Sequence, residues 1–185
     1  MAKKQKSFIG RVFYWLLFGV FVYFGVSALS YADTLRFAHI SDVHISDKTV
    51  DTSFKLLSHS EKLFEDEIEQ INDLSNLDFV IMTGDLADKP QKKLLSRACD
   101  IMNKVKYPWY FTFGNHDAAV GSSFKKNEYF KYILNHNKSM RKIAPENFYY
   151  SFVPKKGYRM IALDATIDTK ITGNGIISKI GRAHV

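Results

Sequence analysis

Three apolar runs, each followed directly by polar residues, constrain the fold of this chain most strongly. Residues 35–40, 79–82 and 109–113 are mostly apolar and predict buried β-strands. Amphipathic segments lie between the runs and predict helices over residues 52–74 and 91–104. Strand, helix, strand, helix, strand is the order typical of parallel strands joined by crossover helices, so the sequence predicts an α/β fold.

The polar residues after the runs form three clusters: Asp42-Val43-His44, Gly84-Asp85-Leu86-Ala87-Asp88 and Gly114-Asn115-His116-Asp117. Ligands bind beyond the carboxyl ends of the strands in an open α/β sheet, so we expect these side chains at one rim. Carboxylate, amide and imidazole groups gathered in one place are ligands for divalent metals. Turn formation alone would explain Asp, Asn and Gly at strand ends, but not a histidine beside the acid in two clusters.

The ordered set D-x-H, G-D-x-x-D and G-N-H-D resembles the pattern of calcineurin-like metallophosphoesterases. The resemblance implies a β-sandwich of two sheets flanked by helices. One domain, or the N-terminal part of one, would then cover residues 33–179. Runs rich in β-forming residues at 148–153 and 158–163 predict a hairpin that would begin the second sheet.

By the same resemblance, two divalent metal ions (Mn, Fe or Zn) would bind at the rim. Asp42 and His44 would hold one metal, Asp85 would bridge both, and Asn115 would bind the second. Asp42 and His44 lie two residues apart, so in extended backbone they would project to the same side. The two ions would share a hydroxide that attacks the phosphorus of a phosphoester substrate.

Three further residues receive roles next to the metals. By resemblance, His116 faces the substrate and does not bind metal, and Asp117 hydrogen-bonds its imidazole. Asp88 either steadies the loop behind the ligands or serves as an acid near the start of the following helix. His39, His59 and His136 are interpreted as strand, helix and loop residues rather than ligands. Lys125 and Lys126 lie at the start of a helix predicted over residues 125–133. They could attract an anionic substrate, but two adjacent lysines are more often solvated, which is the interpretation adopted.

The N-terminus predicts a separate unit over residues 1–32. Four basic residues precede a charge-free stretch at 12–32 that is long enough to cross a bilayer. Ser30-Tyr31-Ala32 would suit a cleaved signal peptide, whereas the unbroken apolar length would suit a membrane anchor. Either alternative predicts an extracytoplasmic domain. Cys99, the single cysteine, permits no intrachain disulfide.

The C-terminus carries none of the later histidine motifs of the resembled family. Residues 180–185, Ile-Gly-Arg-Ala-His-Val, are what a common sequencing-adapter DNA encodes, so we interpret this tail as an artefact and discount His184. A fold incomplete at the C-terminus predicts weak or no activity for this chain. The alternative is a non-catalytic, membrane-associated metal-binding module.

The net charge restricts which classes of binding partner are expected. Of 26 Lys and Arg, four lie in residues 1–32, which hold no acids, so 22 remain against 19 Asp and Glu. That balance gives no basic footprint for nucleic acid. Lys89-Pro90 follows Asp88 where Ser/Thr protein phosphatases of the resembled family carry Arg-Gly, which disfavours protein phosphatase activity. The substrate alternatives are a phosphomonoester, a cyclic nucleotide or other phosphodiester, and a pyrophosphate-linked lipid intermediate.

Overall fold

The computed structural model describes residues 34–118, 122, 124–167 and 175. The leader predicted at 1–32 and the tail at 180–185 lie outside the described residues. None of the helices in the described part of the chain has the length and apolar character that a membrane span requires.

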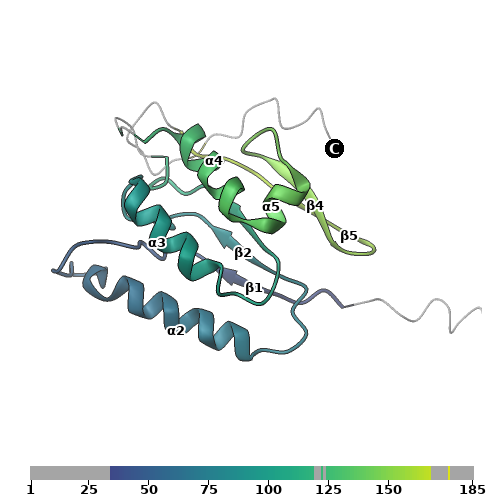
Figure 1. Cartoon of the computed structure of the whole chain (residues 1–185), viewed down its shortest axis with the longest axis horizontal. Helices are drawn as coiled ribbons and strands as arrows, with labels where there is room; N and C mark the ends of the chain where they lie inside the picture. The colour runs from purple at the N-terminus through teal and green to yellow at the C-terminus, as the bar shows by residue number, and fades with distance from the viewer. Residues whose placement is uncertain (1–33, 119–121, 123, 168–174, 176–185) are drawn as a thin grey trace, which may run out of the picture. The chain divides into compact units, whose positions relative to one another are not determined.

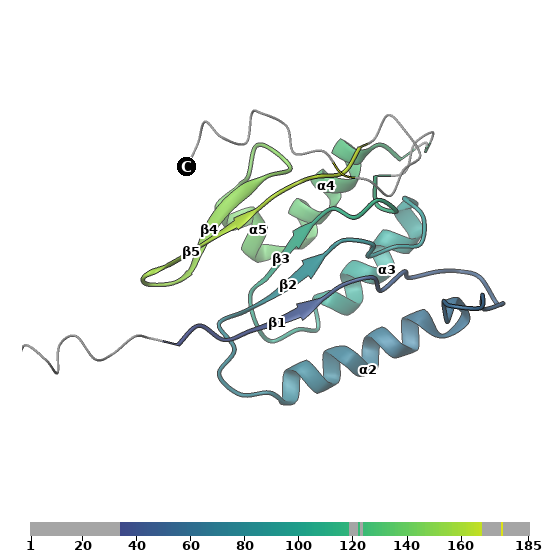
Figure 2. The same cartoon turned by 180° about the vertical axis from the view of Figure 1, so that it is seen from behind.

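The three predicted strands form one parallel sheet in the order β1-β2-β3. Figure 1 shows β1 beside β2, and Figure 2 shows all three strands in this order. The strands are β1 (Phe37–Ile40), β2 (Phe79–Thr83) and β3 (Trp109–Thr112). Ile40 pairs with Met82, and Met82 pairs with Phe111. The strands therefore end nearly level with one another, and the polar clusters that follow them emerge at the same edge.

Two helices connect these strands and pack side by side. They are α2 (Ser60–Asp73) and α3 (Lys92–Met102), and Figure 2 shows α3 behind the strands. Phe64, Ile68 and Ile71 form the buried stripe of α2, as the periodicity predicts.

The predicted helical start at residue 52 is wrong. A single 3-10 turn, η1 (Leu57–His59), precedes α2, and His59 belongs to this turn. The Asp51 carboxylate accepts a hydrogen bond from Ser58 N (2.8 Å), and the Thr52 hydroxyl accepts one from Lys55 N (2.9 Å). Such local side-chain hydrogen bonds compete with helix formation, so the segment before Leu57 forms turns rather than a helix.

Two more helices follow β3, namely α4 (Lys126–His136) and α5 (Lys138–Ile143). His136, predicted in a loop, ends α4 and stacks on Tyr132. Lys126 is not solvated as predicted: it is buried and pairs with Asp164 at 2.5 Å. A buried ammonium requires such a partner because its desolvation is costly.

The predicted hairpin is formed by β4 (Tyr150–Lys155) and β5 (Tyr158–Ala162), which pair antiparallel. Phe152 of β4 stacks on Tyr110 of β3 with ring centroids 3.6 Å apart. The Tyr150 hydroxyl bonds both the N–H and the carbonyl of Phe111, at the edge of β3 that none of the described strands covers. The structure is thus mixed α/β, with a parallel sheet and an antiparallel hairpin packed on it; the complete sandwich stays a prediction.

Candidate metal centre

The loop framework, defined here as residues 41–45, 84–88 and 114–117, follows the carboxyl ends of β1, β2 and β3. Backbone hydrogen bonds join its first two loops: His44 N donates to Asp85 O at 2.8 Å, and Ile45 N donates to Leu86 O at 3.0 Å. Asp88 N returns a bond to Ile45 O at 3.0 Å. Pairing of β1 with β2 therefore resumes beyond the ends of the strands and fixes the two loops against each other.

Two glycines bring the second and third loops into contact. A Cβ on Gly84 would lie 2.4 Å from Gly114 N, and a Cβ on Gly114 would lie 2.1 Å from the Asp85 Oδ1 atom. Gly84 also has φ +87°, which favours glycine. The glycines before Asp85 and Asn115 are thus required by close approach of the two loops.

The predicted extended backbone at Asp42 and His44 is wrong. Both residues are in the left-handed region, with φ 57° and 51°, and Asp85 joins them with φ 53°. Such conformations are uncommon outside glycine, persist where surrounding contacts determine them, and cluster at functional sites. The backbone bonds between the first two loops supply those contacts.

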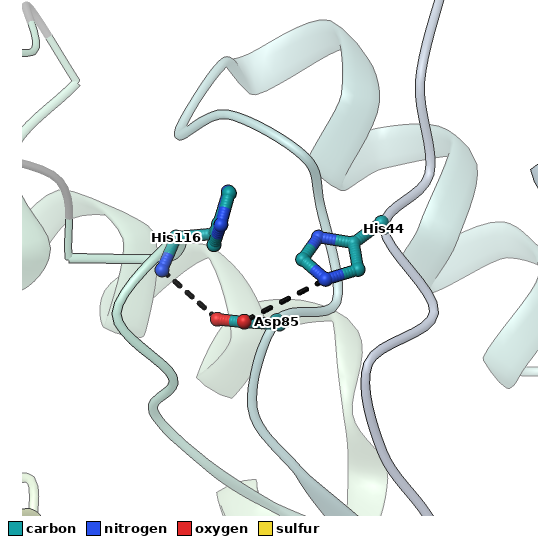
Figure 3. Close-up of side chains that lie close together, drawn as sticks. All are labelled: His44, Asp85 and His116. Atoms are coloured by element: carbon teal, nitrogen blue, oxygen red, sulfur yellow. Dashed lines mark hydrogen bonds and ion pairs between the residues drawn. The ribbon is translucent and has the colours of Figure 1, made fainter. Parts of the chain in front are cut away.

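Three side chains converge at the centre of the framework (Figure 3). His44 Nε2 lies 3.7 Å from Asp85 Oδ2, and the rings of His44 and His116 meet edge to face at 4.6 Å. One ligand atom from each of His44, Asp85 and His116 lies within 4.8 Å of the others. The grouping includes His116, for which the sequence analysis predicts no ligand role.

Asp42 and Asn115 lie at the outer side of this group. The Asp42 Oδ1 atom is 3.9 Å from His44 Nε2, and its side chain is 68% exposed. Asn115 precedes His116 on the third loop and is exposed. The ligand roles of both residues stay predictions.

Asp117 does not hydrogen-bond the His116 imidazole as predicted. Its carboxylate is fully buried and accepts bonds from Asp85 N (2.7 Å), Gly114 N (3.0 Å) and the Tyr129 hydroxyl (2.6 Å). Burial raises the pKa of Asp117 to about 6, although these hydrogen bonds oppose the rise. The buried Asp117 carboxylate thus links the second and third loops by accepting hydrogen bonds from backbone N–H groups of both.

Asp88 takes the position next to His116 that Asp117 was expected to hold. The Asp88 carbonyl oxygen lies 2.8 Å from His116 Nδ1, which therefore donates its proton there. The Asp88 carboxylate pairs with Lys48 at 2.9 Å and lies 4.0 Å from the same ring nitrogen. Partial burial opposes ionisation of Asp88, but the hydrogen bond and charge of Lys48 outweigh it and lower the pKa. The side chain makes no cap on α3, whose N-cap is Gln91.

Lys55 is the residue at the centre that sequence reasoning missed. Its Nζ atom lies 3.5 Å from His44 Nδ1 and 3.4 Å from His116 Nε2. Burial, followed by the positive charge of Lys55, lowers the pKa of His44, which keeps the ring neutral and able to bind a metal. Lys55 belongs to no motif and lies in a segment predicted to be helical, so no local signal pointed to it.

His39 takes the place that the sequence predicts, in strand β1 and away from the centre. Its Nε2 atom lies 2.6 Å from the Thr83 hydroxyl. A hydrogen-bonded strand residue is thus the right interpretation of this histidine.

The donor set fits a divalent metal. Imidazole suits Zn and Fe, and carboxylate oxygen suits Mn and Mg, so the mixed set accommodates the metals named above without deciding among them. A His/Asp/His group that could hold a metal is present in the described residues, and the number of ions is not fixed by it.

Comparison with known proteins agrees with this geometry. The model of the calcineurin-like phosphoesterase family matches residues 35–178, which is most of the chain. A comparison with curated proteins gives no match. The family match spans the sheet, the hairpin and all three loops of the framework. The chain belongs to the calcineurin-like phosphoesterase family.

Proposed function

We propose that this chain is a metal-dependent phosphoester hydrolase whose metal centre is the loop framework. The observation that carries the proposal is the convergence of His44, Asp85 and His116 within 4.8 Å at the ends of three parallel strands. Asp42 and Asn115 lie on the same loops and are the other proposed ligands. Bound divalent metal would supply Lewis acidity that activates water and neutralises phosphoryl oxygens.

The protein groups then have separable tasks. His44 would present a neutral imidazole and Asp85 a carboxylate group to the metal. His116 has its Nδ1 proton held by the Asp88 carbonyl, so Nε2 is the atom that faces the reacting groups. In the proposed hydrolysis, the oxygen of water bonds to phosphorus, the ester P–O bond breaks, and the attacking water releases its proton to solvent. His116 Nε2 takes up a proton from solvent and passes it to the departing oxygen.

The test is metal binding and turnover by the full chain and by Asp85→Asn. Asparagine keeps an oxygen that can accept the bond from His116 N (2.9 Å to Asp85 Oδ1), so the fold is expected to survive. We expect the variant to lose Mn²⁺ affinity by about 100-fold or more, measured by electron paramagnetic resonance. Asp73→Asn, at the exposed end of α2, is the matched control and should bind Mn²⁺ normally.

Hydrolysis of bis(p-nitrophenyl) phosphate is the second readout. Metal binding is the primary measurement, and turnover decides the class of protein. Mn²⁺-dependent turnover that Asp85→Asn abolishes supports the hydrolase. Mn²⁺ binding with no turnover favours the non-catalytic metal-binding module, and absence of both rejects the metal centre.

Export is a separate part of the proposal and rests on residues 1–32 alone. The basic flank and the apolar stretch at 12–32 would place the domain outside the cytoplasm, either anchored or secreted. A C-terminal alkaline phosphatase fusion in a bacterial host should be active. An active β-galactosidase fusion at the same position would reject export.

A further inference from the structure

A pocket of about 490 Å³ opens beside the metal centre. Its volume falls in the range of small-molecule sites. Asp42 and His44 line it on one side, so the pocket is continuous with the loop framework. The apolar part of its lining consists of Val43, Phe54, Leu56, Leu57, Leu63 and Phe64.

Several of these apolar side chains are exposed. Other large apolar residues are exposed elsewhere, Val50 and Val153 among them, but the exposed side chains of the lining belong to the same pocket. Phe54 is 83% exposed, Leu56 is 61% exposed and Leu63 is 50% exposed. A single exposed apolar residue is ordinary, but a group of them at one pocket marks a binding surface. The group lies where segment 46–59, which joins β1 to α2, meets the first turn of α2.

Lys55 lies between the pocket and the candidate metal centre. It lines the pocket between Phe54 and Leu56, and its Nζ atom reaches both His44 and His116. Among the described residues, no carboxylate forms an ion pair with Lys55. An ammonium group placed beside two imidazoles rather than a carboxylate is available to phosphoryl oxygens, which are strong acceptors of charge-assisted hydrogen bonds.

We propose that this pocket binds an uncharged, apolar substituent of the phosphoester substrate, while Lys55 contacts the phosphoryl oxygens. The inference rests on the proposed hydrolase function and adds the substrate class to it. The lining favours an alkyl or aryl group because binding there removes Phe54, Leu56 and Leu63 from water. Glu67 also lines the pocket, and burial raises the pKa of its carboxyl, so this side of the pocket offers no positive charge to a second phosphate.

The experiment measures binding without turnover. Alkylphosphonates have a C–P bond that hydrolysis does not cleave, so the series from methyl- to hexylphosphonate can be titrated into the full chain with Mn²⁺ by calorimetry. Hexylphosphonate should bind about 30-fold more tightly than methylphosphonate, as expected if five added methylenes are each about half buried. Phenylphosphonate should also bind more tightly than the methyl compound.

Two sets of variants separate the two ends of the ligand. Phe54→Ser combined with Leu56→Ser should flatten the dependence on chain length and leave methylphosphonate binding unchanged. Val153→Ser, an exposed apolar residue on β4, is the matched control and should keep the dependence. Circular dichroism of each variant checks that the fold is retained.

Substitution of Lys55 addresses the phosphoryl end. Lys55→Met should weaken every member of the series by a common factor of about ten or more, because each loses one charged hydrogen bond. Lys62→Met, on the exposed side of α2, should weaken none of them. Unchanged affinity in Lys55→Met would remove Lys55 from the proposal.

The outcomes distinguish failure of the pocket proposal from failure of the proposed hydrolase function on which it rests. Binding that requires Mn²⁺ but does not vary with chain length overturns the pocket assignment and leaves the hydrolase proposal standing. Binding that strengthens with chain length in the presence and absence of Mn²⁺ supports the pocket and counts against the metal-dependent site. If the serine variant instead loses binding to neutral phosphatidylcholine vesicles while the series is flat, the exposed residues contact a lipid surface and the proposal is wrong.

Discussion

The loop framework and segment 46–59 meet at the metal centre but are held in place in opposite ways. The framework is fixed by backbone bonds between loops, by the contact of Gly84 with Gly114, and by the buried carboxylate of Asp117. Segment 46–59 is held largely by local turn bonds and leaves Phe54 and Leu56 in water. The contrast indicates that the proposed metal ligands lie on a framework intolerant of change. The residues proposed to select the substrate lie on a segment that can vary.

The largest expected effect comes from filling the contact between the loops. Gly114→Ala would place a Cβ 2.1 Å from Asp85 Oδ1 and 2.4 Å from Asp85 N, so the second and third loops must separate. We expect a loss of about 3 kcal/mol or more in the free energy of unfolding, together with loss of Mn²⁺ binding. Urea denaturation and metal titration measure the two effects.

The matched control for this substitution is Gly157→Ala in the β4–β5 turn. Gly157 has φ +90° but nothing within 4 Å of an added Cβ, so alanine there suffers only backbone strain. That strain should cost about 1–2 kcal/mol and leave metal binding intact. Equal losses in the two variants would mean that the close approach of the loops contributes nothing beyond backbone preference.

A smaller effect is expected from Asp117→Asn. The amide keeps the size of the side chain but replaces one acceptor oxygen with a donor, which then faces backbone N–H groups or the Tyr129 hydroxyl. We expect a loss of about 2–3 kcal/mol in the free energy of unfolding. Asp47→Asn, at an exposed position of segment 46–59, should change it by less than about 0.5 kcal/mol. If Asp117→Asn unfolds at the same urea concentration as the natural chain, Asp117 does not hold the loops.

The sequence predicted the parts of this fold that local patterns determine. Apolar runs placed β1, β2 and β3, and the stripe of Phe64 and Ile68 placed α2, because side-chain periodicity reports which face is buried. The resemblance to a family, confirmed by the match over residues 35–178, selected the three clusters. Their common edge then followed from the parallel order of the strands.

The remaining features depend on contacts between distant segments. The left-handed backbone of Asp42 and His44 follows from pairing with the second loop, which no local pattern around these residues encodes. The buried position of Asp117 depends on Tyr129 of α4, whose hydroxyl donates a hydrogen bond to the carboxylate. Lys55 reaches the centre only because segment 46–59 turns instead of forming a helix.

The pH dependence of metal binding tests how the two regions interact. Burial and the charge of Lys55 lower the pKa of His44 below its usual 6.5, so the proton competes with metal only at lower pH. Mn²⁺ affinity should therefore be nearly constant from pH 8 to 6.5 and fall as the pH drops through the pKa of His44. The fall should approach about tenfold per pH unit, measured by calorimetry in buffers that do not bind metal.

Lys55→Met sharpens this measurement. Removing the cation raises the pKa of His44, so the loss of Mn²⁺ affinity should begin at higher pH, by less than about one unit. If Mn²⁺ affinity began to fall at the same pH in Lys55→Met as in the natural chain, segment 46–59 would not influence the framework through charge. Lys62→Met, whose side chain is 71% exposed on α2, serves again as the control.

The smallest expected effect is on stability when segment 46–59 is changed. Phe54 is 83% exposed, so Phe54→Ser removes little buried surface and should alter the free energy of unfolding by less than about 0.5 kcal/mol. Phe64→Ser on α2, where the ring is 1% exposed, should cost about 3–5 kcal/mol. Urea denaturation of both variants compares the same chemical change in the two environments. If Phe54→Ser destabilised the fold as much as Phe64→Ser, segment 46–59 would be part of the core, and the division between a fixed framework and a variable segment would be wrong.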